Sequence, residues 1–318
     1  MKRICSRVLA VLLLLGALHV IHDPADRLIR LAAAETNDDL QPLITTSELV
    51  VGENRFAFGL MKANKLLESA AVQLRIYSID GPEPRLVAET NAPYHPIGSV
   101  GSGKRVHRHA EGTTHVHRAD SDVRGLYLTR VSFARPGHWG IEIQAREDNG
   151  SLGTARFTVT VLDSSQTPAP GSPAPRSRNL IASDVKDLRE IDTSSPPDPR
   201  LHRVRIADAI AQRKPQLIVF ATPQFCTSRM CGPVVDIVRQ LFSTYGRRVA
   251  FTHQEIWEDF AEKKMFPTVE EWRLDTEPWV FVVDEQGIIR AKFEGLVTLT
   301  ELEAALQQTL QLNASRRQ

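Results

Sequence analysis

Short runs in which apolar and polar residues alternate dominate the chain from about residue 47 to 162. The alternation has a period of two in Val131-Ser132-Phe133 and again at 157–161 (Phe-Thr-Val-Thr-Val), which is the pattern of a half-buried β-strand. Turn-forming residues separate the predicted strands, which fall at 48–60, 71–77, 85–89, 125–133, 139–144 and 154–161. Because no helical period interrupts them, the pattern predicts an all-β sandwich.

The pattern changes after about residue 203, where helical spacing alternates with short, continuous apolar runs. Helices are predicted at 206–212, 234–245 and 300–312, and strands at 217–220, 248–252, 279–283 and 287–294. Residues 284–287 (Asp-Glu-Gln-Gly) are a hairpin signal between the last two strands. This alternation of helices and strands predicts an α/β layered domain.

The two patterned regions are separated by a segment rich in proline, residues 163–200. Proline fixes the backbone in an extended form, so this segment is predicted to be a semi-rigid linker, with a short ordered piece at 181–191 that leans on the next domain. The predicted organisation is therefore multi-domain: a targeting segment at 1–34, a β-sandwich at 35–162, the linker, and an α/β domain at 201–318.

The N-terminus has the form of an export signal, with Lys2, Arg3 and Arg7 around the start of an apolar run at 8–21. The run is shorter than the roughly 20 residues that a transmembrane helix needs. Ala32-Ala33-Ala34 resembles a cleavage site, but charged residues at 22–30 separate it from the run. Cleavage and retention as a membrane anchor both stay open, and either predicts an extracytoplasmic location, secreted or membrane-anchored.

Composition narrows the partners and the redox chemistry. The chain has 318 residues, 42% of them apolar, and a net charge of +1, so two globular domains are expected and nucleic acid is excluded as a partner. Three cysteines in a long exported chain exclude a disulfide framework. Cys5 lies within the targeting segment, so any thiol chemistry of the mature protein belongs to Cys226 and Cys231.

Cys226 follows a predicted strand, and Cys231-Gly232-Pro233 opens a predicted helix. Proline is tolerated in the first turn, and the free N–H groups at a helix N-terminus stabilise a thiolate. A pair of cysteines at this position has the chemistry that disulfide exchange requires.

The order of motifs in this region resembles the thioredoxin-like superfamily, in its TlpA-like and redoxin branch. The resemblance rests on the aromatic residue before Cys226, on Cys231-Gly232-Pro233, on Glu277-Pro278 before a hydrophobic strand, and on the hairpin signal. The β-rich region resembles the immunoglobulin-like modules of exported proteins, through Gly125, Tyr127, Phe133 and a Trp139 that follows Pro-Gly. The implied fold is an N-terminal all-β immunoglobulin-like sandwich plus a C-terminal α/β thioredoxin-like domain.

The resemblance implies that Cys226 and Cys231 are catalytic and that Phe225, Glu277 and Pro278 contact the substrate. Pro278 matches the family's cis-proline, and Glu277 is either an aid to proton transfer or a solvated carboxylate. The spacing departs from the usual C-x-x-C, because five positions along a helix place side chains about 140° apart. The residues between the cysteines must therefore loop, and which cysteine is the nucleophile stays open, with Cys226 preferred.

A second candidate site is a histidine cluster, His107, His109, His115 and His117. In strands, each H-x-H pair would point to one face, and a turn at Glu111-Gly112 would bring the pairs together. Four imidazoles in this arrangement suit copper, zinc or nickel. The alternative is an ordinary polar loop among basic residues.

Three functions are consistent with these features. The first is an extracytoplasmic thiol-disulfide oxidoreductase, whose partners are protein thiols or disulfides and a redox partner, with no resident cofactor. The second is a copper-handling metallochaperone, similar to Sco-like proteins, with the histidine cluster, and His253 as a substitute for their distant histidine. The third is a non-catalytic interaction protein with a degenerate redox domain.

Overall fold

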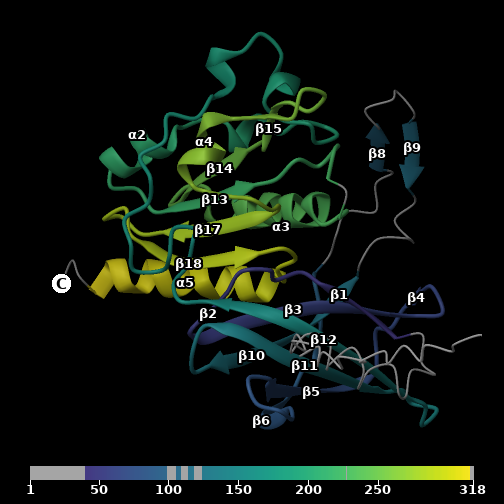
Figure 1. Cartoon of the computed structure of the whole chain (residues 1–318). Coiled ribbons are helices and arrows are strands. Elements are labelled where there is room, and N and C mark those ends of the chain that lie inside the picture. The colour runs from purple at the N-terminus through teal and green to yellow at the C-terminus, as the bar shows by residue number, and fades with distance from the viewer. Residues whose placement is uncertain (1–39, 99–104, 109–113, 118–123, 227, 316–318) are drawn as a thin grey trace, which may run out of the picture.

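The computed structural model describes residues 40–98, 105–108, 114–117, 124–226 and 228–315. It shows two β-sheets packed together, above which lies a third sheet flanked by helices (Figure 1). The targeting segment predicted at 1–34 lies outside the described residues. Among the residues described, no helix is both long enough and apolar enough to cross a membrane.

The first two sheets form the β unit (residues 40–98 and 124–162). One has the strand order β1-β3-β10-β7, with β4 also paired to β3, and the other has the order β2-β12-β11-β5-β6. The strands are β1 (Gln41–Ile44), β2 (Leu49–Val50), β3 (Gly52–Lys62), β4 (Lys65–Leu66), β5 (Ala71–Ser78), β6 (Arg85–Asn91), β7 (Tyr94–Pro96), β10 (Gly125–Phe133), β11 (Gly137–Arg146) and β12 (Leu152–Leu162).

Alternate residues of these strands point inward and fill the space between the two sheets, as the period of two predicts. The buried core includes Phe56 and Phe58 from β3, and Ile141 and Ile143 from β11. The aromatic residues noted in the sequence, Tyr127, Phe133 and Trp139, are at most 3% exposed. The prediction of a β-rich region built from these runs is confirmed, although the run 48–60 divides into β2 and β3, which belong to different sheets, and β1, β4 and β7 are additional.

The third sheet, with its helices, forms the α/β unit (residues 201–315). Its strand order is β14-β13-β17-β18, with β13 parallel to β14 and antiparallel to β17. Its elements are α2 (Ile206–Ala211), β13 (Gln216–Phe220), α3 (Cys231–Tyr245), β14 (Ala250–Gln254), β15 (Trp257–Asp259), β16 (Lys264–Met265), α4 (Pro267–Glu271), β17 (Trp279–Val283), β18 (Ile289–Glu294) and α5 (Leu299–Ser315). All seven helices and strands predicted here are present, whereas β15, β16 and α4 are additional.

Both faces of this sheet are covered, which is why its central strands β13 and β17 are apolar except for the buried Gln216 at the start of β13. Leu217 and Val219 of β13 face α3 and α5, while Ile218 and Phe220 face the opposite core, which also contains Trp272. Because successive strand residues point to opposite faces, a continuous apolar run is what a doubly covered strand requires.

The segment predicted to be a linker, residues 163–200, packs against the α/β unit. Ala174 and Ile191 are buried in the core that contains Trp272, and Ser177 accepts a hydrogen bond of 3.0 Å from the indole Nε1 of Trp272. The segment contains two short 3-10 helices, η2 (Ala182–Asp184) and η3 (Leu188–Glu190), and a third, η4 (Pro199–Leu201), spans its C-terminal end. Much of this segment therefore contributes side chains to the fold.

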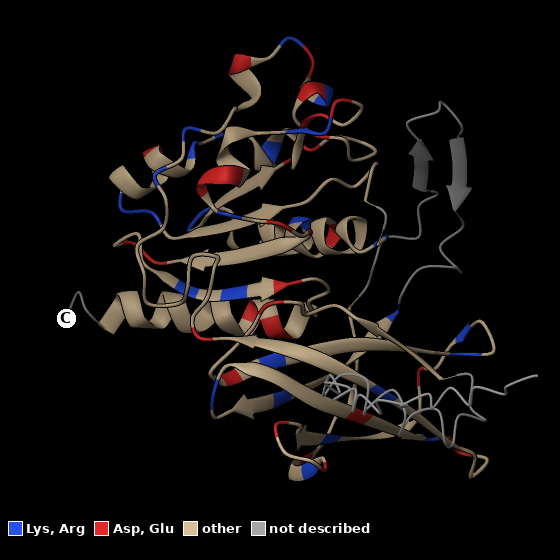
Figure 2. Cartoon of the chain, viewed as in Figure 1, with Lys and Arg blue, Asp and Glu red and all other residues tan. Residues whose placement is uncertain are grey.

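The β unit and the α/β unit meet in a shared core and a band of charged residues. Ala57, Ile97 and Leu126 of the β unit are buried in the same cluster as the residues of α3. The Arg55 guanidinium donates to Glu301 at 2.8 Å and to the Leu296 carbonyl at 2.7 Å. Figure 2 shows acidic and basic residues gathered where β18 and α5 face the β unit. The two units are therefore joined by both apolar packing and ion pairs.

Gly295 directly follows β18 at this junction and has a backbone φ of 69°, in the left-handed region. A Cβ atom at this position would lie 2.2 Å from the carbonyl oxygen of Thr45. The close approach of the two units therefore requires glycine here.

Candidate functional site

The cysteine pair lies where the chain leaves β13 and enters α3. The Cys226 N–H donates to the Thr222 carbonyl at 3.0 Å, and the Arg229 N–H donates to the Cys226 carbonyl at 3.3 Å. Arg229 has a φ of 61°, which turns the chain before α3 begins at Cys231. The residues between the cysteines therefore loop, as the five-residue spacing requires, and both residues are free thiols.

Cys226 has the environment of a reactive thiol. It is 5% exposed, whereas Cys231 is 0% exposed, and its Sγ lies 3.1 Å from the Ser228 hydroxyl. A hydrogen bond from the Cys231 thiol lowers the pKa of Cys226 to about 6, helped by Ser228 and by the backbone N–H of Cys231, against the opposing effect of burial. The thiolate is therefore the main form of Cys226 at neutral pH.

Cys231 is held as a thiol. Its complete burial raises its pKa well above the ordinary value, and the neighbouring Cys226 thiolate adds to this effect. The Cys231 Sγ also lies 3.3 Å from the Glu277 Oε2, to which it donates. One thiol proton thus has two acceptors within reach, the Cys226 sulfur and the Glu277 carboxylate.

Glu277 reaches the pair from the loop before β17. Its Oε2 accepts the Thr222 N–H at 2.8 Å as well as the Cys231 thiol. Burial raises the pKa of Glu277 to about 7, and the charge of Cys226 acts in the same direction. Of the two roles that the sequence left open, a freely solvated carboxylate is wrong, because this side chain is bonded to the cysteine site.

The two other predicted substrate-binding residues flank the cysteines. Phe225 is half-buried and stacks on Phe260, with ring centroids 4.5 Å apart. Pro278 is buried, its peptide bond to Glu277 is cis, and its carbonyl accepts the Gly295 N–H at 2.8 Å. Of the three predicted substrate-binding residues, Glu277 therefore contacts Cys231 directly, whereas Phe225 and Pro278 are the chain neighbours of Cys226 and Glu277.

The histidine cluster is described only at the level of the backbone. Strands β8 (Arg105–Arg108) and β9 (Thr114–His117) pair antiparallel, with His107 opposite His115. His109 and the turn predicted at 111–112 lie outside the described residues. This pairing agrees with the predicted hairpin. The segment that contains β8 and β9 is inserted between Ile97 and Arg124 of the β unit, where the Ile97 N–H donates to the Arg124 carbonyl at 3.0 Å.

A second cluster of titratable side chains, which the sequence did not reveal, lies buried behind β13 and β14. Asp192, His202, His253 and Glu255 are each at most 1% exposed. Asp192 comes from the predicted linker and the other three from the α/β unit, where only His253 and Glu255 are near one another in sequence. His253, considered in the sequence only as a copper ligand, faces Asp192.

Two groups of described side chains have ligand-type atoms within 4.8 Å of one another: Asp192 with His202 and His253, and Cys226 with Cys231 and Glu277. In the first group each carboxylate oxygen of Asp192 already accepts a backbone N–H, from Ser194 at 2.9 Å and from Asp198 at 2.8 Å. In the second group, two sulfur atoms offer soft ligands, which suit Cu(I) or Zn²⁺.

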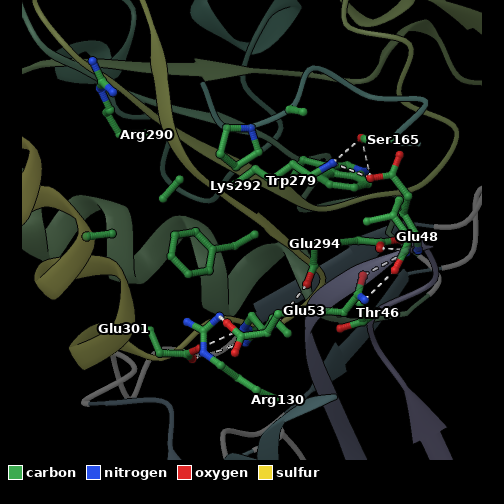
Figure 3. Close-up of a pocket in the computed structure, with 18 of the residues that line it drawn as sticks. Thr46, Glu48, Glu53, Arg130, Ser165, Trp279, Arg290, Lys292, Glu294 and Glu301 are labelled. Atoms are coloured by element: carbon green, nitrogen blue, oxygen red, sulfur yellow. Dashed lines mark hydrogen bonds and ion pairs between the residues drawn. The ribbon is translucent and has the colours of Figure 1, made fainter. Parts of the chain in front are cut away.

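A cavity of about 590 Å³ lies at the junction of the two units, away from the cysteines (Figure 3). Lys292 pairs with Glu48 and Arg55 pairs with Glu301 across the junction. The pair Arg130–Glu53 lies within the β unit, and the pair Arg290–Asp284 lies within the α/β unit. Glu294, which also lines the cavity, accepts hydrogen bonds from the Ser47 N–H and the Thr276 hydroxyl.

Comparisons with known proteins identify no family. No protein-family model and no curated protein matches the chain. Among solved structures, the soluble domain of PmoD from Methylocystis sp. ATCC 49242 (Rockwell) matches with 12% identity and a TM-score of 0.23, over 40% of this chain and 94% of that one. CopC from Methylosinus trichosporium OB3b matches with 10% identity and a TM-score of 0.21, over 40% of this chain and 98% of its own. Murine CRIg has the same identity and TM-score, over 39% and 99%. At these TM-scores the matches carry no argument about function.

Proposed function

We propose that the protein is a thiol-disulfide oxidoreductase that acts on protein thiols or disulfides through Cys226 and Cys231. The observation that carries this proposal is the opposite tuning of two neighbouring thiols at the start of α3. The pKa of Cys226 is lowered to about 6 and that of Cys231 is raised by burial. Two-step exchange requires one cysteine that is already a thiolate and can attack first. It also requires a second cysteine that stays protonated until the mixed disulfide has formed.

In the proposed reaction, the Cys226 thiolate attacks one sulfur of a partner's disulfide and forms a mixed disulfide, and the other partner sulfur leaves as a thiolate. Cys231 then gives its proton to Glu277, whose Oε2 lies 3.3 Å away. The resulting Cys231 thiolate attacks the Cys226 sulfur and releases the second partner sulfur. The partner's disulfide is reduced, and the protein's two thiols are oxidised to a disulfide.

The wider proposal places this site in an extracytoplasmic thioredoxin-like domain, with an immunoglobulin-like module that positions clients. Support comes from the export-type N-terminus, from β13, α3, β17, β18 and α5 in the order that the motifs imply, and from the firm junction between the units. The oxidoreductase function is also supported by Phe225, which is half-buried next to Cys226.

The first test measures the ionisation of Cys226 and traps the mixed disulfide. In the Cys231→Ser variant, iodoacetamide should modify Cys226 at a rate that rises with pH and reaches its half-maximum below the ordinary value of 9.0, since Ser228 and the backbone N–H of Cys231 remain to stabilise the thiolate. The same variant, mixed with a disulfide-bonded substrate such as insulin, should accumulate a covalent complex visible by mass spectrometry.

The unfolded Cys231→Ser chain serves as the control, because its Cys226 should titrate as an ordinary thiol. A native midpoint that equals the unfolded one, together with no covalent complex, would rule out the proposed exchange.

A second candidate function is copper handling, favoured by the convergence of two sulfur atoms and the Glu277 carboxylate within 4.8 Å. These residues would hold Cu(I) through soft sulfur ligands. Titration with Cu(I) against a competing chelator tests this function. Near-stoichiometric binding lost in the Cys226→Ser/Cys231→Ser double variant would assign metal to the cysteines. If Cu(I) binding is instead lost when His107, His109, His115 and His117 are replaced by alanine, the metal site lies in the histidine hairpin.

A further inference from the structure

Asp192, His202 and His253 form a cluster that the proposed function does not use, and we call it the buried histidine site. Asp192 comes from the segment 163–200, and His202 forms a β-bridge with Thr252, the residue before His253 in β14. All three members are at most 1% exposed, and their ligand-type atoms lie within 4.8 Å of one another. Tertiary packing therefore gathers two imidazoles and one carboxylate in a small space that is closed to solvent.

The ring of His253 has a backbone partner at one nitrogen only. Its Nε2 lies 2.9 Å from the Ala221 carbonyl, which can only accept, so Nε2 carries a proton. Among the described residues, its buried Nδ1 has no hydrogen-bond partner, and it faces Asp192 Oδ1 at 3.5 Å. A neutral ring would therefore point a lone pair at a carboxylate, which is repulsive. A cation between the two groups removes this repulsion, and it is either a second proton on the ring or a metal ion.

The separations of the donor atoms fit a metal ion better than a proton. A charge-assisted hydrogen bond between an imidazolium and a carboxylate is about 2.7–2.9 Å long. The observed separations are longer, at 3.5 Å from Asp192 Oδ1 to His253 Nδ1 and 3.2 Å from Asp192 Oδ2 to His202 Nε2. Two ligands of a tetrahedral zinc ion, each about 2.0–2.1 Å from it, lie about 3.3–3.4 Å apart. Both contacts are close to the separation that such an ion imposes.

Backbone groups orient these donors as the surroundings of a metal site do. A histidine that binds metal usually donates its other ring N–H to a carbonyl or a carboxylate, which fixes its tautomer, and the Ala221 carbonyl does this for His253. Asp192 Oδ1 accepts the Ser194 N–H at 2.9 Å, and Oδ2 accepts the Asp198 N–H at 2.8 Å. Each oxygen keeps a second lone pair, so both remain able to bind an ion.

We propose that the buried histidine site binds a Zn²⁺ ion through His202 Nε2, His253 Nδ1 and both oxygens of Asp192. The two oxygens face one imidazole each, so the site offers four donor atoms, the number that a structural zinc site has. Two imidazoles disfavour Mg²⁺ and Ca²⁺, and a donor set without sulfur disfavours Cu(I). Two histidines and a carboxylate also suit Fe(II), but with open coordination positions, which residues at most 1% exposed do not provide.

This ion would tie the segment 163–200 to β14, so its role is structural and goes beyond the proposed thiol exchange. The test uses Zn²⁺ and the full chain, stripped of metal with a chelator. The wild type should bind Zn²⁺ in competition with a chromophoric chelator. Asp192→Asn and His202→Gln should each lower the affinity at least about 100-fold, because losing an outer-shell partner alone costs up to about that much. His138→Ala, which removes an exposed imidazole of the β unit, is the matched control and should change nothing.

A second measurement leaves the buried histidine site intact and separates it from the other clusters that attract Zn²⁺. In it, alanine replaces the four histidines of the hairpin, His107, His109, His115 and His117. X-ray absorption of the zinc-loaded variant should show nitrogen and oxygen ligands at about 2.0–2.1 Å, whereas zinc on Cys226 and Cys231 would show sulfur at about 2.3 Å. Loss of Zn²⁺ from this variant, or sulfur around it, overturns the proposal. Equal Zn²⁺ affinity of the wild type and a folded Asp192→Asn variant also overturns it.

Discussion

Replacing Cys226 by serine is expected to lower the rate of insulin reduction at least about 100-fold, because a hydroxyl can neither ionise near pH 7 nor form a disulfide. The structure supports Cys226 as the nucleophile, since it is the more accessible thiol and the one whose pKa is lowered, to about 6. Turbidity of reduced insulin, in the presence of a dithiol reductant, gives the rate for the wild type and the variant.

Ser228→Ala is the companion variant, because it keeps the nucleophile and removes only the hydroxyl that lies 3.1 Å from the Cys226 sulfur. It should raise the pKa of Cys226 by about one unit, which is the size expected for one hydrogen bond to a charged group, and leave exchange measurable. If Cys226→Ser stays active while Cys231→Ser is inactive, the roles of the two cysteines are reversed.

Replacing Trp272 by alanine is expected to lower the free energy of unfolding by about 3–5 kcal/mol, a large part of the stability of an ordinary domain. Trp272 is 0% exposed, and its ring lies 5.1 Å from that of Phe220 and 4.6 Å from that of Phe281. Its removal leaves a cavity that backbone elements on both sides hold open. Urea denaturation followed by circular dichroism measures the loss.

Ser177→Ala separates the hydrogen bond to the indole from the packing, and should cost about 1 kcal/mol. Leu180→Ala, at a side chain that is 40% exposed in the same segment, should change stability by less than about 0.5 kcal/mol. A loss below about 1 kcal/mol for Trp272→Ala would contradict the packing of this core. A measurable effect of Ser177→Ala would place residues of the predicted linker in the folded core.

Periodicity predicted the positions of the main strands and helices well, because side-chain alternation is a local property. The run 157–161 lies in β12, and the apolar run 217–220 lies in β13, which is buried on both faces. For the predicted linker, local reasoning was right only in part. Proline keeps residues 163–200 out of long helices and strands, and Ile191 is buried against the α/β unit, as expected for the ordered piece at 181–191. Ala174, which lies outside that piece, is buried as well, because an extended chain can pack against the surface of a folded unit.

Some features of the cysteine site were likewise predictable from the sequence, whereas others depend on the tertiary structure. From the order of residues alone, the sequence predicted two thiols at a strand-to-helix loop and an aromatic residue next to one of them, because these features involve adjacent residues. The order of motifs also predicted Glu277-Pro278 as part of the site. The opposite pKa shifts depend on the packed structure: the Cys231 thiol and Ser228 lower the pKa of Cys226, whereas burial raises the pKa of Cys231. Glu277, which accepts from the Cys231 thiol, lies 46 positions away along the chain. The buried cluster of Asp192, His253 and Glu255 could not be predicted from the sequence, since Asp192 meets the segment 253–255 only after the two have packed together and excluded water.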